Sequence, residues 1–137
     1  MTESQQKTLH CRLISPEQTV LDGHAWFAAL PAHDGQVGVA VDHAPLICKL
    51  GIGSLRIDTI EGRRYYFIDG GFARVRNNEL VILASTAVPA DQIDPATAQE
   101  RLAQARSMSL ADPARHDCLL RAKTQLALVR AEARKAG

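Results

Sequence analysis

The spacing of apolar residues changes near residue 87, and this change constrains the fold more than any other feature of the chain. From Thr8 to Thr86 apolar residues occur in short runs, and Leu9, Cys11 and Leu13 are separated by single polar residues. Alternation of this kind is typical of a half-buried β-strand. Later apolar residues recur at three- and four-residue spacings, which predicts amphipathic helices. The sequence therefore predicts a mainly β plus α chain, with a β unit over residues 1–87 and a linker and helical hairpin over 88–137.

Turn signals divide the β unit into short segments. We expect a turn at Ser15-Pro16-Glu17-Gln18, a strand from His24 to Leu30, and a bend at Gly51-Ile52-Gly53. Glu61-Gly62 and Asn77-Asn78 lie between β-rich runs and predict hairpins, because glycine and asparagine accept a positive φ more readily than other residues. Roughly six to ten short strands at this spacing indicate an all-β sandwich or barrel.

The helical part carries two start signals, Asp94-Pro95 and Asp112-Pro113. Aspartate caps free backbone N–H groups, and proline fits the first helical position. A connection near residues 109–111 predicts an antiparallel hairpin. Its second helix should bury one stripe, formed by Leu119, Ala122, Leu126, Val129 and Ala133. Because alanine buries little apolar area, we expect the hairpin to be marginally stable alone and able to move relative to the β unit.

Composition excludes several classes of protein. The net charge is +1, which argues against a nucleic-acid-binding domain. Cys11, Cys48 and Cys118 are an odd number of widely spaced thiols, which favours a reducing compartment and buried structural cysteines. The chain carries no signal-peptide pattern and no run of about 20 apolar residues. Any association with a membrane is therefore expected to be peripheral and through another protein.

No catalytic constellation is evident, so we expect no catalytic residue, no metal and no cofactor. The sequence contains no Gly-x-Ser-x-Gly, no phosphate-binding loop and no His-x-x-x-His. His24, His33 and His43 could be imagined as metal ligands, and a metal-dependent β-sandwich enzyme is the alternative that they suggest. A generic adaptor, with one partner for each half of the chain, is a further alternative.

Two glycine-anchored segments carry a resemblance to a known family. Gly35 and Gly38 lead to His43-Ala44-Pro45-Leu46, and Gly70-Gly71-Phe72 is followed by Leu83-Ala84. Together with the β unit and the alanine-rich hairpin, these motifs resemble the epsilon subunit of F-type ATP synthase, which is called delta in mitochondria. The resemblance extends over nearly the whole chain.

The resemblance implies a ten-stranded β-sandwich followed by two antiparallel helices. It also implies a non-catalytic rotor subunit of the central stalk, which binds the gamma subunit and rests on the ring of c subunits. In bacteria the hairpin can extend toward the catalytic alpha and beta subunits and inhibit ATP hydrolysis. The expected location is the cytoplasmic face of the bacterial inner membrane, without insertion into the bilayer.

The resemblance also points to two groups of residues. The loop expected to face the c-ring contains Gln36, Asp42, His43 and Pro45. The regulatory helix is basic from residue 121 onward and is expected to act through Arg121, Lys123 and Arg130. Such basic residues complement a helix C-terminus and could meet an acidic surface, although solvation alone also explains them.

Two departures from the family pattern matter. The Pro-Gly that usually precedes His43 is Val41-Asp42 here, which changes the shape and charge of the loop. In family members that bind regulatory ATP, the first helix starts with Ile/Leu-Asp-x-x-Arg-Ala; this chain has Thr97 in place of the arginine. The loss of that cation predicts weak or no ATP binding, so Asp94 would be a nucleotide-site residue only if the weakened motif still functions.

Overall fold

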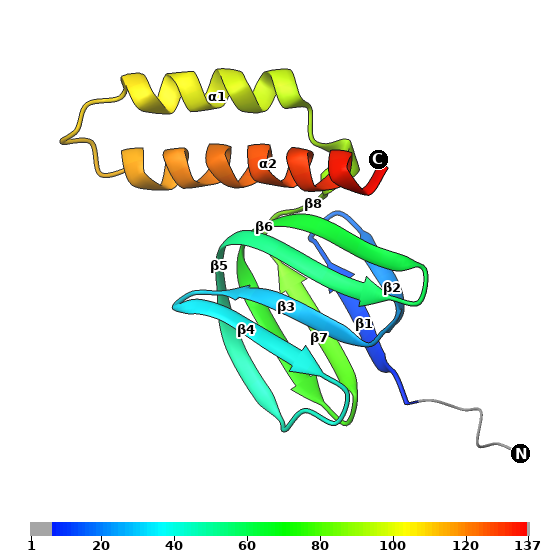
Figure 1. Cartoon of the computed structure of the whole chain (residues 1–137). Coiled ribbons are helices and arrows are strands. Elements are labelled where there is room, and N and C mark those ends of the chain that lie inside the picture. The colour runs from blue at the N-terminus through cyan, green and yellow to red at the C-terminus, as the bar shows by residue number, and fades with distance from the viewer. Residues whose placement is uncertain (1–6, 137) are drawn as a thin grey trace, which may run out of the picture.

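Eight strands form one sheet that folds over itself (Figure 1), within the residues 7–136 that the computed structural model describes. The order is β2-β1-β7-β6-β5-β3-β4, and β8 pairs with β6. β1 and β7 run parallel, and the other pairs are antiparallel. The strands are β1 Leu9–Ile14, β2 Thr19–Ala25, β3 Phe27–Ala32, β4 Gly35–Ala40, β5 Leu46–Thr59, β6 Gly62–Arg76, β7 Glu79–Ala84 and β8 Ala87–Pro89.

The two longest strands, β5 and β6, pair with each other along most of their length. β6 pairs with β8 over Tyr66–Ile68 and with β7 over Gly71–Arg76, so its neighbour changes at the Gly70-Gly71 bend. Both glycines have positive φ angles, 78° and 123°. The resemblance implies ten strands, whereas the described residues form eight. The bend expected at residues 51–53 is also wrong, because β5 runs unbroken from Leu46 to Thr59.

The core is aliphatic and follows the predicted alternation. Leu9, Cys11 and Leu13 of β1 are each 0 % exposed, whereas His10 and Arg12 lie on the opposite face of the strand. Burial of each large aliphatic side chain contributes about 1.5–3 kcal/mol. The largest fully buried side chains of the sandwich come from both layers, and include Leu9, Leu13, Leu30, Val39, Leu55, Ile57, Ile68, Val75, Leu80 and Ile82.

The predicted turns form, but one predicted strand is wrong. Ser15 and Gln18 exchange backbone hydrogen bonds, and Asn77 and Asn78 have φ angles of 52° and 60°, as a two-residue hairpin turn requires. The strand expected from residue 24 to 30 is divided at Trp26 between β2 and β3. Strand propensity could not reveal this break, because it depends on which neighbour each half pairs with.

The hairpin consists of α1 Pro95–Ser107 and α2 Arg115–Ala136, preceded by the short 3-10 helix η2 Ala90–Gln92. Asp94 caps α1 as predicted, and its carboxylate accepts a hydrogen bond from the Ala96 N–H at 3.3 Å. The second start signal lies in the turn before α2 and does not form the first turn of the helix. Asp112 accepts from the Ala114 N–H at 2.9 Å in a turn that precedes the helix, and α2 begins only at Arg115.

α2 lies between α1 and the sandwich, and it therefore buries two lines of residues (Figure 1). Ala122 and Leu126 pack against α1, as the predicted stripe requires. Leu128 is only 2 % exposed and packs with Phe67 and Ala90 on the side of the sheet. The predicted stripe is wrong at Ala133, which is exposed.

Candidate functional site

The loop between β4 and β5 is tied to the turn between β6 and β7. The Asp42 N–H donates to Asn78 Oδ1 at 2.6 Å, and Asn78 Nδ2 donates to Asp42 Oδ1 at 3.0 Å. Lys7 Nζ lies 3.3 Å from Asp42 Oδ2. The Asn78 amide, with Lys7, lowers the pKa of Asp42. The structure thus places Asp42, His43 and Pro45 in one loop that a second loop holds in position.

Gln36 does not lie with these three residues. It is near the start of β4, where it pairs with Pro31, whereas Asp42 follows the end of the same strand. A strand rises about 3.3 Å per residue, so the two sites are on the order of 20 Å apart. The expected loop is therefore divided into two places at opposite ends of β4.

A second surface, which sequence reasoning missed, is apolar. Ile47 on β5, Phe72 on β6 and Leu83 on β7 are 73 %, 56 % and 53 % exposed. Phe72 and Leu83 are direct cross-strand partners, and Phe72 also pairs with Lys49. We call these three apolar side chains the outer patch. A shallow groove of about 560 Å³ adjoins the patch, and its lining includes Ile14, Phe72 and Leu83.

The three basic residues expected on the regulatory helix face two directions. Arg121 Nε donates to Asp69 Oδ2 of β6 at 2.7 Å, and this carboxylate raises the pKa of Arg121. Lys123 and Arg130 are exposed and lie roughly two helical turns apart on the same face of α2. The structure therefore separates a residue that contacts the sandwich from two that point to solvent.

A cavity of about 480 Å³ lies where the hairpin meets the sheet. Phe67 and Val88 contribute apolar walls from the sheet, and Met108 and Ala105 contribute walls from the hairpin side. Arg121 reaches Asp69 at its border. Sequence reasoning did not find this cavity, because its walls come from segments far apart in the chain.

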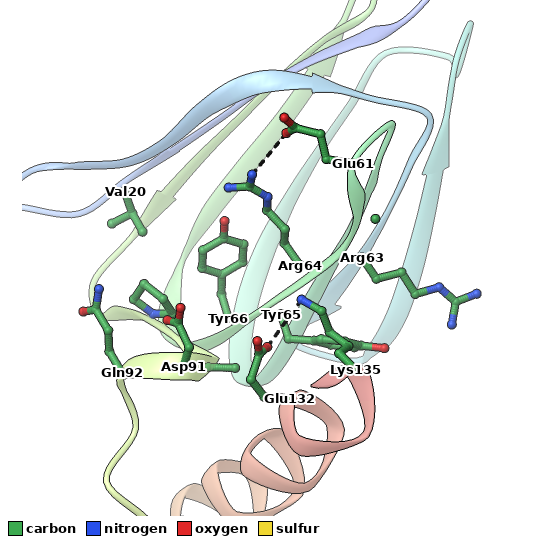
Figure 2. Close-up of a pocket in the computed structure, with 13 residues that line it drawn as sticks. Val20, Glu61, Arg63, Arg64, Tyr65, Tyr66, Asp91, Gln92, Glu132 and Lys135 are labelled. Atoms are coloured by element: carbon green, nitrogen blue, oxygen red, sulfur yellow. Dashed lines mark hydrogen bonds and ion pairs between the residues drawn. The ribbon is translucent and has the colours of Figure 1, made fainter. Parts of the chain in front are cut away.

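A second cavity of about 490 Å³ lies at the C-terminal end of α2, beside the β5–β6 turn (Figure 2). Its cations have acidic neighbours. Arg64 Nη2 is 3.2 Å from Glu61 Oε1, and Lys135 Nζ is 3.5 Å from Glu132 Oε1 and lies over the Tyr65 ring. Because these charges are paired, the cavity is better described as a polar contact region between helix and sheet than as a site for an anion.

The start of α1 uses Asp94 for a structural purpose. Its carboxylate accepts hydrogen bonds from the Thr97 hydroxyl and the Ala96 N–H, and these bonds lower the pKa of Asp94. Thr97 occupies the position where an arginine would complete the nucleotide motif. The Asp94 carboxylate is thus engaged in capping the helix.

The candidate metal ligands lie on different elements. His24 is on β2, His33 is in the β3–β4 turn and His43 is in the β4–β5 loop. Among residues 7–136 no group of three His, Cys, Asp or Glu side chains is arranged to hold a metal ion. No described helix combines the length and hydropathy that a membrane span needs.

The cysteines are free thiols in different environments. Cys11 is buried, and burial raises its pKa to about 12. Cys48 is partly exposed rather than buried, which corrects the sequence expectation, and desolvation still raises its pKa. Cys118 is also partly exposed and lines the cavity between hairpin and sheet.

Comparison with known proteins gives consistent results. Residues 8–90 match the family described as the ATP synthase delta/epsilon chain, beta-sandwich domain. An ATP synthase epsilon chain of Rhodopirellula baltica is 42 % identical over 106 residues, which cover 77 % of this chain and 83 % of the relative. That of Delftia acidovorans is 31 % identical and covers 91 % of both chains.

Solved structures agree in fold. A chain of the Euglena gracilis mitochondrial ATP synthase, in a complex of OSCP, F1 and c-ring, superposes with a TM-score of 0.71 at 23 % identity, covering 96 % of this chain and 84 % of that one. A chain of the Tetrahymena thermophila central stalk and c-ring gives a TM-score of 0.60 at 12 % identity, covering 93 % and 98 %. With the match of the β unit and the identity to these relatives, the chain belongs to the delta/epsilon chain family of ATP synthase.

Proposed function

We propose that this chain is a non-catalytic rotor subunit of the central stalk of an F-type ATP synthase. The observation that carries the proposal is the 42 % identity to an ATP synthase epsilon chain over 106 residues, which extends beyond the β unit into the hairpin. The chain would link rotation of the c-ring to the catalytic head through the gamma subunit. It would lie at the cytoplasmic face of a bacterial inner membrane as a peripheral protein.

The outer patch is the proposed binding face for gamma. Its side chains, Ile47, Phe72 and Leu83, are more than half exposed on three adjacent strands. Exposed apolar side chains that cluster in this way are typical of protein interfaces, because a partner removes them from water. Lys49 and Arg74 lie in the same cross-strand rows and would form part of a polar rim.

The c-ring would meet the β4–β5 loop through Asp42, His43 and Pro45. These residues are surface-accessible at one end of the sandwich, and two hydrogen bonds to Asn78 hold the loop. Gln36, at the far end of β4, would be a separate point of contact with a partner.

Residues 1–87 would be the partner-binding unit and 88–137 the linker and regulatory hairpin. The docked hairpin is supported on the sheet by Leu128 and by the ion pair between Arg121 and Asp69. The exposed Lys123 and Arg130 would contact the catalytic alpha and beta subunits when the hairpin leaves the sandwich. ATP hydrolysis would then be inhibited.

Co-purification with the gamma subunit of the same operon tests the assignment. We expect a stable one-to-one complex with the wild-type chain and its loss in the Phe72→Ser/Leu83→Ser variant. Ile60→Ser is the matched control, because Ile60 is 80 % exposed in the β5–β6 turn, outside the patch. No complex with the wild-type chain would overturn the proposal and favour an adaptor with another partner.

The regulatory role has its own test in the assembled enzyme. Removal of residues 88–137 should raise ATP hydrolysis if the hairpin inhibits. Charge reversal at Lys123 and Arg130 should reproduce part of this rise without loss of the subunit from the complex. Unchanged rates of ATP hydrolysis in both variants would mean that the hairpin does not regulate the enzyme.

A further inference from the structure

Asp42 has an unusual backbone conformation. Its φ angle is 65°, in the left-handed region that glycine adopts without penalty and that other residues seldom adopt. Aspartate tolerates the region better than most residues, because its short side chain can form local hydrogen bonds. A residue other than glycine keeps this conformation only where neighbouring contacts hold it in place.

Asn78 supplies such contacts from a different loop. One side-chain amide forms two bonds to the same residue, accepting from the Asp42 N–H at 2.6 Å and donating to the Asp42 carboxylate at 3.0 Å. Asn78 itself has a φ of 60° in the tight β6–β7 turn, so its position is fixed by the hairpin. The two loops form one unit although they are far apart in the sequence.

The hydrogen bonds also define what the loop offers to a partner. His43 Nδ1 lies 2.7 Å from the Ala44 carbonyl oxygen, and because a carbonyl oxygen can only accept, Nδ1 carries the hydrogen. In the neutral ring Nε2 is then an acceptor, and no hydrogen bond within residues 7–136 reaches it. The Asp42 carboxylate is likewise an acceptor, and Pro45 has no N–H.

We propose that Asn78 is the positioning residue of the ring-facing loop, and that it presents Asp42 and His43 as an acceptor surface for a partner loop with basic, hydrogen-bond-donating side chains. Lys7 beside Asp42 offsets part of the negative charge, and a partner cation would compete with it for the carboxylate. The inference rests on the proposed function, because it takes the c-ring as the partner. It adds to the proposed function the residue that positions the loop and the kind of side chain that the loop would bind.

The test measures binding of the complex of this chain with gamma to liposomes that contain the purified c-ring. Asn78→Gly removes the side chain and keeps the positive φ of the turn. We expect it to weaken binding about two- to tenfold, the range that loss of one or two hydrogen bonds produces. Asn77→Gly is the matched control, since it alters the neighbouring residue of the same turn and should bind as the wild type does.

A double variant separates positioning from general damage. If Asn78 acts by holding the conformation of Asp42, then Asn78→Gly should have no further effect in the Asp42→Gly background, where glycine adopts the conformation unaided. If Asn78→Gly weakens binding equally in the wild-type and the Asp42→Gly chain, Asn78 does not act by holding the conformation of Asp42. Thermal unfolding of each variant, and its retention of gamma, show whether the sandwich is intact.

Asp42→Asn tests the chemistry of the partner. It keeps a carbonyl acceptor and the tolerance for positive φ but removes the charge. We expect weaker binding at low salt and a difference from the wild type that shrinks as salt rises, because exposed charges are screened. A difference in binding between Asp42→Asn and the wild type that does not depend on salt would contradict a partner with basic side chains. If the wild-type complex does not bind c-ring liposomes, the ring contact of the proposed function fails and this inference with it; if it binds and Asn78→Gly binds equally, only this inference fails.

Discussion

Arg121 on α2 donates a hydrogen bond to Asp69 on β6 over 2.7 Å, and Asp69 directly precedes the Gly70-Gly71 bend. The pair joins the hairpin to the sandwich at the point where β6 changes its neighbour. The two side chains are 42 % and 27 % exposed, so water screens part of their attraction. Such pairs contribute on the order of 0.2–1 kcal/mol, which biases a contact without making it permanent.

Arg121→Gln should loosen the docked hairpin without unfolding it. A loss of 0.2–1 kcal/mol raises the undocked population about 1.5- to 5-fold, so amide hydrogen exchange in α2 should accelerate by that factor. Asp69→Asn should have a similar effect, and the double variant should add little to either. Lys123→Gln is the control, because Lys123 is exposed on the same helix. Equal acceleration in Lys123→Gln would contradict a specific role for the pair.

The sequence allowed prediction of the order of elements and much of the packing, because both depend on local periodicity. The stripe of Ala122 and Leu126 was predicted correctly, whereas Leu128 was missed. A helix that packs between a second helix and a sheet buries two lines of residues, and the sequence alone does not show that a second surface is present. Arg121 and Asp69 could not be paired either, since nothing local connects them.

The candidate site was predictable only where a single loop carries it. Asp42, His43 and Pro45 are neighbours in sequence and remain so in space, while Gln36 lies at the other end of β4. The outer patch was missed for another reason. Alternation shows that Phe72 shares a face with other residues of β6, but not which face of the sheet remains uncovered.

Leu128→Ala should destabilise hairpin docking more than it destabilises the sandwich. Leu128 is 2 % exposed against Phe67 and Ala90, and loss of a buried leucine costs about 2–5 kcal/mol. Hydrogen exchange should rise throughout α2 while β1 and β7 remain protected. Leu120→Ala, at a position that is 37 % exposed, should change little. Uniform loss of protection over the whole chain would show that hairpin and sandwich unfold as one unit.

Gly71→Ala should impair folding of the sandwich itself. A Cβ at this position would overlap the Leu83 carbonyl oxygen, and the φ of 123° is strained for alanine. Backbone strain alone costs on the order of 1–3 kcal/mol, and the steric overlap adds to it. Gly23→Ala is the control, because no heavy atom lies within 4 Å of its Cβ and its φ is not positive. Chemical denaturation of the two variants should give clearly different midpoints.

The three cysteines should differ in reactivity with iodoacetamide at pH 8. Cys11 is 0 % exposed and its pKa is raised to about 12, so almost no thiolate forms in the folded chain. Cys48 and Cys118 are partly exposed and should be modified first. Peptide mass spectrometry over time should show Cys11 modified only after denaturant is added. Early modification of Cys11 would mean that β1 opens readily from the sheet.

The hydrogen bond from the Asn78 amide to the Asp42 carboxylate should weaken only in acid. Hydrogen bonds from Asn78 and Lys7 lower the pKa of Asp42 below its ordinary 3.8. A lowered folded pKa means that the stabilisation is complete above the unfolded pKa and disappears as the pH falls through the folded value. This hydrogen bond should therefore persist at pH 4 and weaken at lower pH, while the bond from the Asp42 N–H to Asn78 Oδ1 does not depend on the charge. A titration of the Asp42 carboxyl carbon by NMR should show a midpoint below 3.8 that rises in Asn78→Gly and does not rise in Asn77→Gly. A midpoint that is the same in all three chains would mean that the Asn78 amide does not stabilise the charged carboxylate.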